Sequence, residues 1–271
     1  MIVPTMLALI LDVLAARGHG LPHLRTLSYG GGRMPVSVIE RAMQMLPAVD
    51  FVNAYGLTET SSTIAMLTPD DHRAAITSED ATVRRRLGSV GMPLPTVDLE
   101  VRDRDGSVLP AGEVGEIFVR GEQIAGEYLG KSMLNETGWF PTKDSGWIDE
   151  AGYLFVEGRL DDVIVRGGEN ISPGEIEDRL RSHPAVADVA VVGIPDDRWG
   201  EKIAAVIVPV SGELPSQEEL AAWVRQAMRS IKTPETWAFR SELPYNETGK
   251  LLRRLIRAEL ARNTQTSTPR P

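Results

Sequence analysis

The 271-residue sequence contains no cysteine. This absence excludes disulfides, thiolate nucleophiles and cysteine-ligated metals, and it is typical of a protein in the reducing cytoplasm. Basic residues are outnumbered 29 to 38, and at a formal net charge of −9 the chain lacks the attraction that draws proteins to nucleic acid. No apolar run approaches the roughly 20 residues that span a bilayer. We therefore expect no nucleic-acid partner and no integral membrane segment.

Histidines are few and scattered. The sequence has four, none at metal-ligand spacing from another, and we interpret them as surface or structural residues: His19, His23, His72 and His183. The first twenty residues have no basic leader, and Asp12 interrupts their apolar run, so an amphipathic helix is favoured over a targeting segment. Its predicted buried face comprises Met6, Leu9, Ile10, Val13 and Leu14. Residues 84–86, three consecutive arginines, are interpreted as a solvated loop.

Residues 1–160 have the pattern of part of a large domain. Over residues 1–95, a strand at 24–29, a helix at about 35–46 and a strand at 51–55 alternate, which predicts part of a parallel α/β sheet. Residues 96–160 change to short strands with turn signals, such as 97–102 and 114–120 around Asp103-Arg104-Asp105-Gly106, and predict a small antiparallel β subdomain.

Residues 161–262 have the composition of a second, compact α+β domain. We predict strands at 163–165, 186–194, 203–210 and 237–239, and helices at 173–182, 216–231 and 251–261. Ser172 and Ser216 are the expected N-caps. The polar segment 263–271 is expected to be a disordered tail. The predicted fold class is thus α/β plus α+β, with a truncated large domain followed by a small one.

Four segments carry residue types suited to nucleotide chemistry. In chain order they are Tyr55-Gly56-Leu57-Thr58-Glu59-Thr60, Lys143-Asp144, Gly158-Arg159-Leu160-Asp161-Asp162 continuing to Gly167-Gly168, and Glu247-Thr248-Gly249-Lys250. Each segment alone has an ordinary structural explanation, such as a strand-end aromatic for Tyr55 or an exposed lysine for Lys250. Four of them in one order over about 200 residues resemble the signature of the adenylate-forming superfamily of acyl-CoA synthetases, peptide synthetase adenylation domains and luciferase.

This resemblance implies an AMP-forming acid–CoA ligase of fatty acid metabolism that uses ATP, Mg²⁺ and CoA. It implies that Tyr55, Gly56 and Arg159 bind the nucleotide and that Asp144 binds its ribose. It also implies nucleotide binding by three glycines that end the strand next to Tyr55: Gly30, Gly31 and Gly32. The implied catalytic residues are Lys250, Thr58 at the α-phosphate and Glu59 as the magnesium ligand.

The small domain is implied to be a mobile lid. Asp161 occupies the hinge position of the superfamily, and Gly167 and Gly168 match the loop that borders the pantetheine channel of CoA. One position departs from the superfamily pattern, because Lys143 stands where members usually have glycine. A lysine forced to positive φ is strained, so the placement of Asp144 needs to be observed.

The superfamily loop that holds the β- and γ-phosphates has no counterpart in residues 1–271. We therefore expect a carboxyl-terminal half-molecule, either a fragment or a chain completed by an amino-terminal half in another chain. Two alternatives stay open beside a CoA ligase for carboxylic acids. One is transfer of the acyl group to a carrier protein, and the other is a non-catalytic nucleotide-binding remnant.

Overall fold

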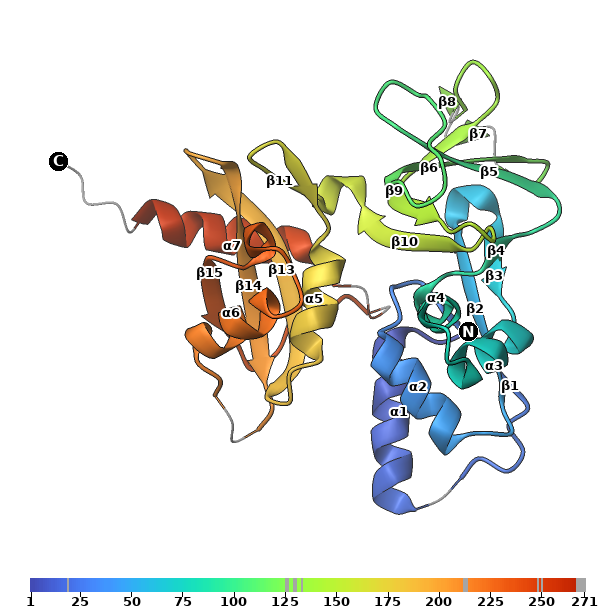
Figure 1. Cartoon of the computed structure of the whole chain (residues 1–271), viewed down its shortest axis with the longest axis horizontal. Coiled ribbons are helices and arrows are strands. Elements are labelled where there is room, and N and C mark those ends of the chain that lie inside the picture. Colours follow the sequence, from blue (N-terminus) through green and yellow to red (C-terminus); the bar gives the residue numbers. More distant parts are fainter. Residues whose placement is uncertain are drawn as a thin grey trace. The chain divides into compact units, whose positions relative to one another are not determined.

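The computed structural model describes residues 1–18, 20–124, 127–128, 131–132, 134–211, 214–247, 249 and 251–266, with the backbone alone at 127–128, 131–132 and 263–266. The chain folds as two compact units, Met1–Val156 and Glu157–Pro271. Figure 1 shows the helices and strands of both units.

A four-stranded sheet of order β1-β2-β3-β4 begins the first unit. β1 and β2 are parallel, from Thr26↔Asp50 to Gly30↔Ala54, and a helix connects them, which confirms the predicted strand–helix–strand unit. β3 and β4 are antiparallel additions, so the sheet is mixed rather than parallel throughout. The elements are α1 (Pro4–Arg17), β1 (Thr26–Gly30), α2 (Val36–Met45), β2 (Asp50–Leu57), β3 (Ser62–Leu67), α3 (Pro69–Thr77), α4 (Ala81–Arg85) and β4 (Met92–Pro93).

Helix α1 buries a different face from the one predicted. Leu7 and Leu11 are fully buried, whereas Met6, Leu9 and Val13 are exposed. Apolar residues surround most of this helix, so the sequence period does not select one face. The buried pair instead packs with residues of β1, β2 and α2, including Tyr29, Phe51 and Ile39.

The second sheet has the order β10-β9-β6-β5. Strands β5 and β6 pair antiparallel as predicted, and Gly106 takes a φ of 85° in the turn between them. Strand β9 was not expected from its sequence, which contains proline and glycine. The strands are β5 (Val97–Arg102), β6 (Gly115–Gly121), β9 (Phe140–Ile148) and β10 (Leu154–Arg159), and a short pair β7 (Glu127–Tyr128) and β8 (Lys131–Ser132) lies between β6 and β9 in sequence.

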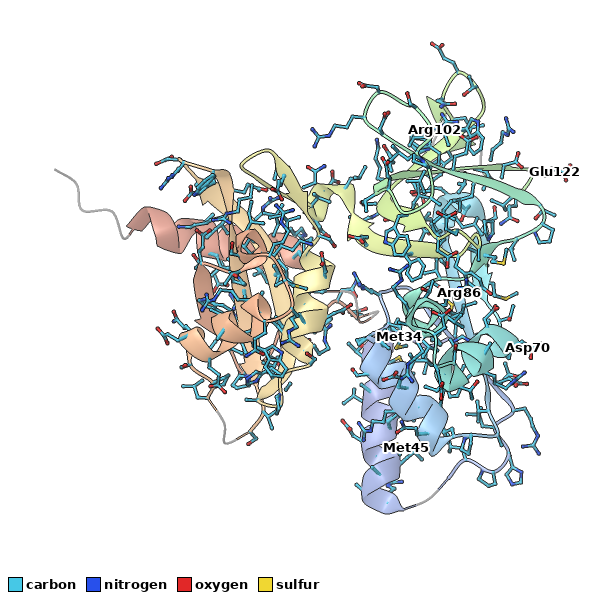
Figure 2. The ribbon with its side chains drawn as sticks, in the orientation of Figure 1. Met34, Met45, Asp70, Arg86, Arg102 and Glu122 are labelled. Atoms are coloured by element: carbon cyan, nitrogen blue, oxygen red, sulfur yellow. The ribbon has the colours of Figure 1, made fainter. Side chains whose placement is uncertain are left out.

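The three consecutive arginines do not form the solvated loop that was predicted. They span the end of α4 and the following 3₁₀ turn, Arg86–Gly88. The guanidinium of Arg85 lies 4.7 Å from the centroid of the Trp147 ring, which stacks on Phe155. Arg86, labelled in Figure 2, donates to Asp149 at 3.1 Å. Two of the arginines therefore tie the helical segment to the second sheet.

The second unit is a sheet covered on both faces. β13 and β14 pair antiparallel and are buried on both sides, which explains their continuous apolar sequence. Residues of α5 and α6 pack on one face, and Ile256 and Leu260 of α7 pack on the other. The elements are β11 (Ile164–Arg166), β12 (Glu169–Ile171), α5 (Pro173–Arg181), β13 (Val186–Asp196), β14 (Gly200–Pro209), α6 (Gln217–Arg225), β15 (Thr236–Phe239) and α7 (Arg253–Thr266).

Helix ends in the second unit differ in part from the predictions. Ser216 caps α6 by accepting from the backbone N–H of Glu219, as expected, but the helix ends at Arg225. Ser172 makes no side-chain cap, and its hydroxyl donates to the carbonyl of Glu157 instead. Helix α7 continues to Thr266, four residues into the expected tail, and residues 267–271 lie outside the described part.

Two of the four histidines are buried in structural positions. His72 is hydrogen-bonded to the Tyr29 hydroxyl at 2.8 Å, and His183 packs edge-on against Trp223. His23 is exposed, and His19 lies outside the described residues. Among the helices that the structure describes, none has the length and apolar character needed to cross a membrane.

Candidate nucleotide-binding site

The predicted motif begins where two parallel strands end. Gly30 and Ala54 are the last pair of the parallel ladder between β1 and β2, and β2 continues to Leu57; a Cβ on Gly30 would lie 2.3 Å from the carbonyl oxygen of Ala54. A Cβ on Gly56 would lie 1.7 Å from the carbonyl oxygen of Ser62. Both glycines therefore allow close strand contact around Tyr55. Open α/β sheets bind ligands at this edge of their parallel strands.

The segment after Tyr55 is a strained turn. Thr58–Thr60 form one 3₁₀ turn, and the two serines that follow take positive φ angles, 53° at Ser61 and 101° at Ser62. Positive φ is costly for residues with a Cβ and persists only when the surroundings enforce it. Strain of this kind gathers at ligand-binding positions. The turn presents an exposed Thr58 and a half-buried Glu59.

Two polar residues hold this turn in place: Thr60, which belongs to the quoted motif but was given no role, and Gln123, which the sequence analysis missed. Thr60 is fully buried, and its hydroxyl accepts from the backbone N–H of Leu57 and lies 2.8 Å from the carbonyl of Ser62. Gln123 donates to the carbonyls of Thr60 and Thr63 at 3.1 and 2.8 Å. Gln123 lies 63 positions from Thr60, and no local pattern in the sequence marks it.

The structure brings Tyr55 and Asp144 into direct contact. The Tyr55 hydroxyl donates to Oδ2 of Asp144 at 2.6 Å, although the two residues are 89 positions apart. Asp144 is only 6% exposed, and Tyr55 is half-buried. Hydrogen bonds that hydroxyl groups donate to carboxylates are short, and the 2.6 Å between Tyr55 and Asp144 is in keeping with this. Two residues predicted to bind different parts of one nucleotide are thus neighbours.

A bulge in β9 presents Asp144. The pairing of β9 with β6 shifts register between Glu116 and Phe118, and residues 142–144 lie on the bulged side. Thr142 is buried, and its hydroxyl donates to the carbonyl of Ile117 at 2.8 Å and accepts from the backbone N–H of Asp144 at 3.1 Å. These bonds fix the backbone from which the Asp144 carboxylate projects.

Lys143 has the backbone conformation that its replacement of glycine predicts. Its φ is 62°, in the left-handed region. Its backbone N–H donates to Glu116 at 3.2 Å, and its ammonium lies 3.5 Å from the same carboxylate oxygen. The lysine therefore keeps the turn geometry, held by Glu116, and Asp144 still reaches Tyr55.

The other site residues of the sequence analysis lie in the second unit. Arg159 is the half-buried last residue of β10, and Asp161 is exposed in the 3₁₀ turn Leu160–Asp162. Gly167 and Gly168, with φ angles of 57° and 85°, form the two-residue turn between β11 and β12. Two positive φ angles in a row are what a tight hairpin turn requires. This structural requirement accounts for both glycines by itself.

Lys250 lies outside the described residues, but its flanks are well anchored. The Tyr245 hydroxyl donates to Asp188 at 2.7 Å, and Arg253 donates to both oxygens of the buried Glu177 at 2.6 Å. Burial raises the pKa of Tyr245, and the bond to Asp188 raises it further. Burial alone would lower the pKa of Arg253, but Glu177 outweighs it and raises that pKa.

Within the described residues, no group of three or more histidine or acidic side chains is arranged to hold a metal ion. Glu59 is a single half-buried carboxylate on the strained turn. Mg²⁺ is commonly held by one or two carboxylates together with substrate phosphates and water. Glu59 therefore fits a magnesium ion that a bound nucleotide also holds, and it does not fit a metal site built by the protein alone.

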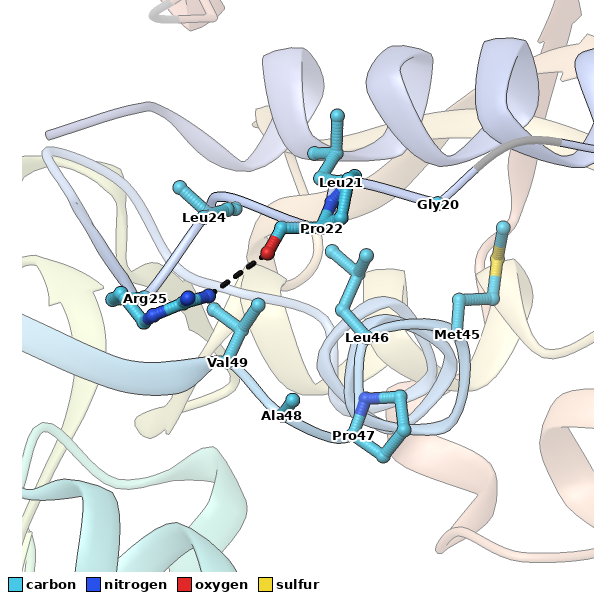
Figure 3. A pocket seen from close by; sticks show the side chains of 10 residues that line it. All are labelled: Gly20, Leu21, Pro22, Leu24, Arg25, Met45, Leu46, Pro47, Ala48 and Val49. Carbon is cyan, nitrogen blue, oxygen red and sulfur yellow. Dashed lines mark hydrogen bonds between the residues drawn. The ribbon is translucent and has the colours of Figure 1, made fainter.

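A pocket of about 430 Å³ lies at the opposite end of the parallel strands (Figure 3). It is formed by the segments that precede β1 and β2, including Leu24, Met45, Leu46 and Val49. These are the amino ends of the two strands, whereas Gly30 and Tyr55 lie at their carboxyl ends. The pocket therefore takes no part in the candidate site.

Two family models match the chain. The model of the AMP-binding enzyme matches residues 1–129, and the model of the AMP-binding enzyme C-terminal domain matches residues 175–250. The chain belongs to the family of AMP-binding, adenylate-forming enzymes. This finding confirms the resemblance drawn from the four ordered motifs, and the mixed α/β fold class is confirmed by the solved structures of the family.

Three relatives show the range of the family. The fatty acid–[acyl-carrier-protein] ligase ScoC of Streptomyces coeruleorubidus is 36% identical over 94% of this chain and 48% of its own length. The amide bond synthetase McbA of Marinactinospora thermotolerans superposes with a TM-score of 0.84 at 33% identity, over 95% of this chain and 52% of that one. The o-succinylbenzoate CoA synthetase MenE of Bacillus subtilis, in complex with its acyl-adenylate intermediate, superposes with a TM-score of 0.76 at 32% identity. The superposition covers 99% of this chain and 50% of that one.

The chain spans about half the length of the curated relatives it matches. The names of these three relatives differ in what the acid is joined to or which bond is made: an acyl-carrier protein for ScoC, an amide bond for McbA and CoA for MenE. Likeness to these relatives therefore supports acid adenylation and leaves the acceptor to be decided.

Proposed function

We propose that this chain is the carboxyl-terminal half of an ATP-dependent acid–CoA ligase. In the first step a carboxylate oxygen attacks the α-phosphorus of ATP, and pyrophosphate leaves. In the second step the CoA sulfur attacks the acyl carbon, the thioester forms, and AMP leaves. The observation that carries the proposal is the Tyr55–Asp144 contact at 2.6 Å beside the strained turn at Thr58, at the carboxyl end of β2.

The first unit supplies the nucleotide contacts in this proposal. The ring of Tyr55 stacks on adenine, with the glycines of residues 30–32 ending the adjacent strand, and Asp144 accepts from the ribose hydroxyls. The Thr58 hydroxyl donates to the α-phosphate, where negative charge grows as pyrophosphate leaves. Glu59 would ligate Mg²⁺, which supplies positive charge at the phosphates when bound.

The second unit acts as the lid in this proposal. Asp161 is the pivot, and the ammonium of Lys250 neutralises charge on the reacting oxygens during adenylation. Arg159 contacts the nucleotide, and Gly167 and Gly168 border the path of the CoA pantetheine arm. On either side of Lys250 in the sequence, Tyr245 and Arg253 are hydrogen-bonded to Asp188 and Glu177.

Fatty acids are the proposed substrate class, in the cytoplasm, and CoA is the proposed acceptor. The carrier-protein alternative gains support from ScoC, whose name gives a carrier-protein acceptor. Supplying free CoA and a phosphopantetheinylated carrier in parallel, with product analysis, separates the two acceptors.

The decisive experiment joins this chain to the amino-terminal half of a relative and measures acid-dependent release of pyrophosphate. We expect release with ATP and a fatty acid, and loss of at least a hundredfold in Lys250→Ala, because removing even one positioned hydrogen-bond donor that stabilises transition-state charge costs about 10² to 10³ in rate. Exposed Arg254→Ala is the control. An unchanged rate in Lys250→Ala would show that the lysine has been assigned wrongly.

A non-catalytic nucleotide-binding protein is the remaining alternative. Calorimetry of the 271-residue chain with ATP, AMP and a non-hydrolysable acyl-AMP mimic tests it, in parallel with the turnover assay. Binding without turnover in the joined protein favours this alternative, and turnover removes it.

A further inference from the structure

The Tyr55 hydroxyl has a role that ring stacking does not explain. A phenylalanine would stack on adenine equally well, yet this side chain carries a hydroxyl that donates to Asp144 at 2.6 Å. Asp144 as a whole is 6% exposed, so protein groups decide the orientation of its side chain more than water does. The hydroxyl is therefore part of what orients Asp144.

The backbone beneath Asp144 is already fixed. Thr142 holds the N–H of Asp144, and Glu116 holds the N–H of Lys143, so the bulge cannot rotate the residue as a whole. With the backbone fixed, the direction of the carboxylate depends on the side-chain torsions of Asp144. Tyr55 lies on a different strand, β2, and its hydrogen bond restricts those torsions from outside the bulge.

We propose that Tyr55 is a positioning residue that sets Asp144 to distinguish ribonucleotides from deoxyribonucleotides; this inference rests on the proposed function. A carboxylate has about four acceptor sites, which is more than one phenol and two vicinal ribose hydroxyls together require. Holding an acceptor in its bound orientation before the ligand arrives removes an ordering cost from each hydroxyl that it accepts. The Tyr55 hydroxyl and the ribose hydroxyls are therefore energetically coupled.

This coupling separates a positioning role from a merely structural one. If Tyr55 only stabilised the fold or only stacked on adenine, removing its hydroxyl would weaken the binding of AMP and of deoxy-AMP by the same factor. If it orients Asp144, the loss falls mainly on the nucleotide that has both ribose hydroxyls. A double-mutant cycle between a protein hydroxyl and a ligand hydroxyl measures this difference.

The chain contains a matched control. The Tyr153 hydroxyl donates to Asp71 at the same 2.6 Å, and Asp71 closes the capping box of α3 with Thr68. Both pairs join a tyrosine and an aspartate of the first unit, but Tyr153 has no part in the proposed nucleotide site. Tyr153→Phe therefore reports the loss of a tyrosine–aspartate bond as such.

The experiment measures dissociation constants of AMP, 2′-deoxy-AMP and 3′-deoxy-AMP by calorimetry or NMR titration of the 271-residue chain. AMP is the probe because it lacks the β- and γ-phosphates. For the wild type and for Tyr153→Phe we expect each deoxy-nucleotide to bind more weakly than AMP by the same ratio. For Tyr55→Phe we expect the dissociation constant of AMP to rise roughly tenfold, the scale of one hydrogen bond to a charged group. We expect the ratio of the deoxy-nucleotide dissociation constant to that of AMP to fall by at least threefold.

Three results would overturn the inference. An unchanged ratio in Tyr55→Phe, with AMP still bound, overturns the positioning role and leaves the proposed function standing. An equal fall of the ratio in Tyr153→Phe shows that the effect is not local to Asp144, and also overturns it. Failure of the wild-type chain to bind AMP overturns the proposed nucleotide site and the inference together.

Discussion

Lys143 adopts a backbone conformation that residues with a Cβ disfavour, and the turn that presents Asp144 depends on it. A residue with a Cβ pays about 1–2 kcal/mol in the left-handed region, and Lys143 sits there with a φ of 62°. Two contacts with Glu116 offset part of this cost. The consequence is that the turn keeps a left-handed residue at position 143 and that Asp144 reaches the Tyr55 hydroxyl.

We predict that Lys143→Gly raises the free energy of unfolding by about 0.5–1 kcal/mol, because glycine enters the left-handed region without steric cost but loses more entropy on folding. Lys143→Ala keeps the strain and removes only the ion pair, whose lysine side chain is 63% exposed, so we expect little change or a slight loss. Urea unfolding measures the free energy of unfolding of both variants, and an m-value equal to that of the wild type shows that the change is one of stability. Equal stability of the two variants would contradict a strained lysine.

At the scale of elements, α3 is attached to the first sheet by a buried polar pair. His72 on α3 bonds to the Tyr29 hydroxyl of β1 and to the carbonyl of Thr68, and the residue is 1% exposed. Burial lowers the pKa of His72, against the opposing effects of the Thr68 carbonyl and of Asp71, and Arg73 lowers it further. The same burial raises the pKa of Tyr29.

We predict that His72 makes the first unit less stable as the pH falls below about 6.5, the ordinary pKa of histidine. Because its folded pKa is lowered, the unfolded chain binds the proton more readily, so this contribution is complete above that pH and is lost below it. Urea unfolding at pH 8 and pH 5 measures the effect. The decrease in the free energy of unfolding from pH 8 to pH 5 should be smaller in His72→Gln than in the wild type. An equal decrease in both proteins would contradict the prediction. His23→Gln, at an exposed position, controls for the removal of one histidine.

The elements that could be predicted from sequence are those whose pattern has one physical cause. β5 has the predicted bounds, Val97–Arg102, because it alternates and ends at a turn with glycine. β13 and β14 are continuous apolar runs buried on both faces. β9 was missed because Pro141 and Gly146 read as turn residues, and the face of α1 was wrong because the helix is apolar on several sides.

The sequence nominates residues for the candidate site but not their geometry. The motifs marked Tyr55 and Asp144 as parts of one family pattern, and the match of the AMP-binding enzyme model to residues 1–129 agrees with that family. The hydrogen bond between the two residues depends on the register between β6 and β9 and on a bulge, which no local pattern encodes. Gln123 was missed for the same reason, since it acts on a turn that lies far from it in sequence.

At the scale of the whole molecule, each unit has its own hydrophobic core. In Glu157–Pro271, one cluster contains Ile176, Val191 and Leu220, and a second contains Val192, Val206 and Ile256, on the two faces of one sheet. All their members come from this unit alone. A domain with a closed core of its own is expected to fold by itself.

We predict that residues 157–271 expressed alone unfold cooperatively in urea, with an m-value of about 1–2 kcal/mol/M for a domain of this size. Ile207→Asp places a charge at a fully buried core position and should abolish the transition, whereas Leu255→Asp, at an exposed position, should not. Gradual, non-cooperative unfolding of the unmodified segment would contradict an independent second unit.

The pocket at the amino ends of β1 and β2 has a practical consequence for inhibitor discovery. From Asp50 to Tyr55 along β2 the chain rises about 16 Å, at roughly 3.3 Å per residue. A screen aimed at the cavity beside Leu46 would therefore select compounds that bind at the same time as a nucleotide. Such compounds would show no competition with AMP at the proposed site, whereas adenosine mimics that contact Asp144 would compete directly.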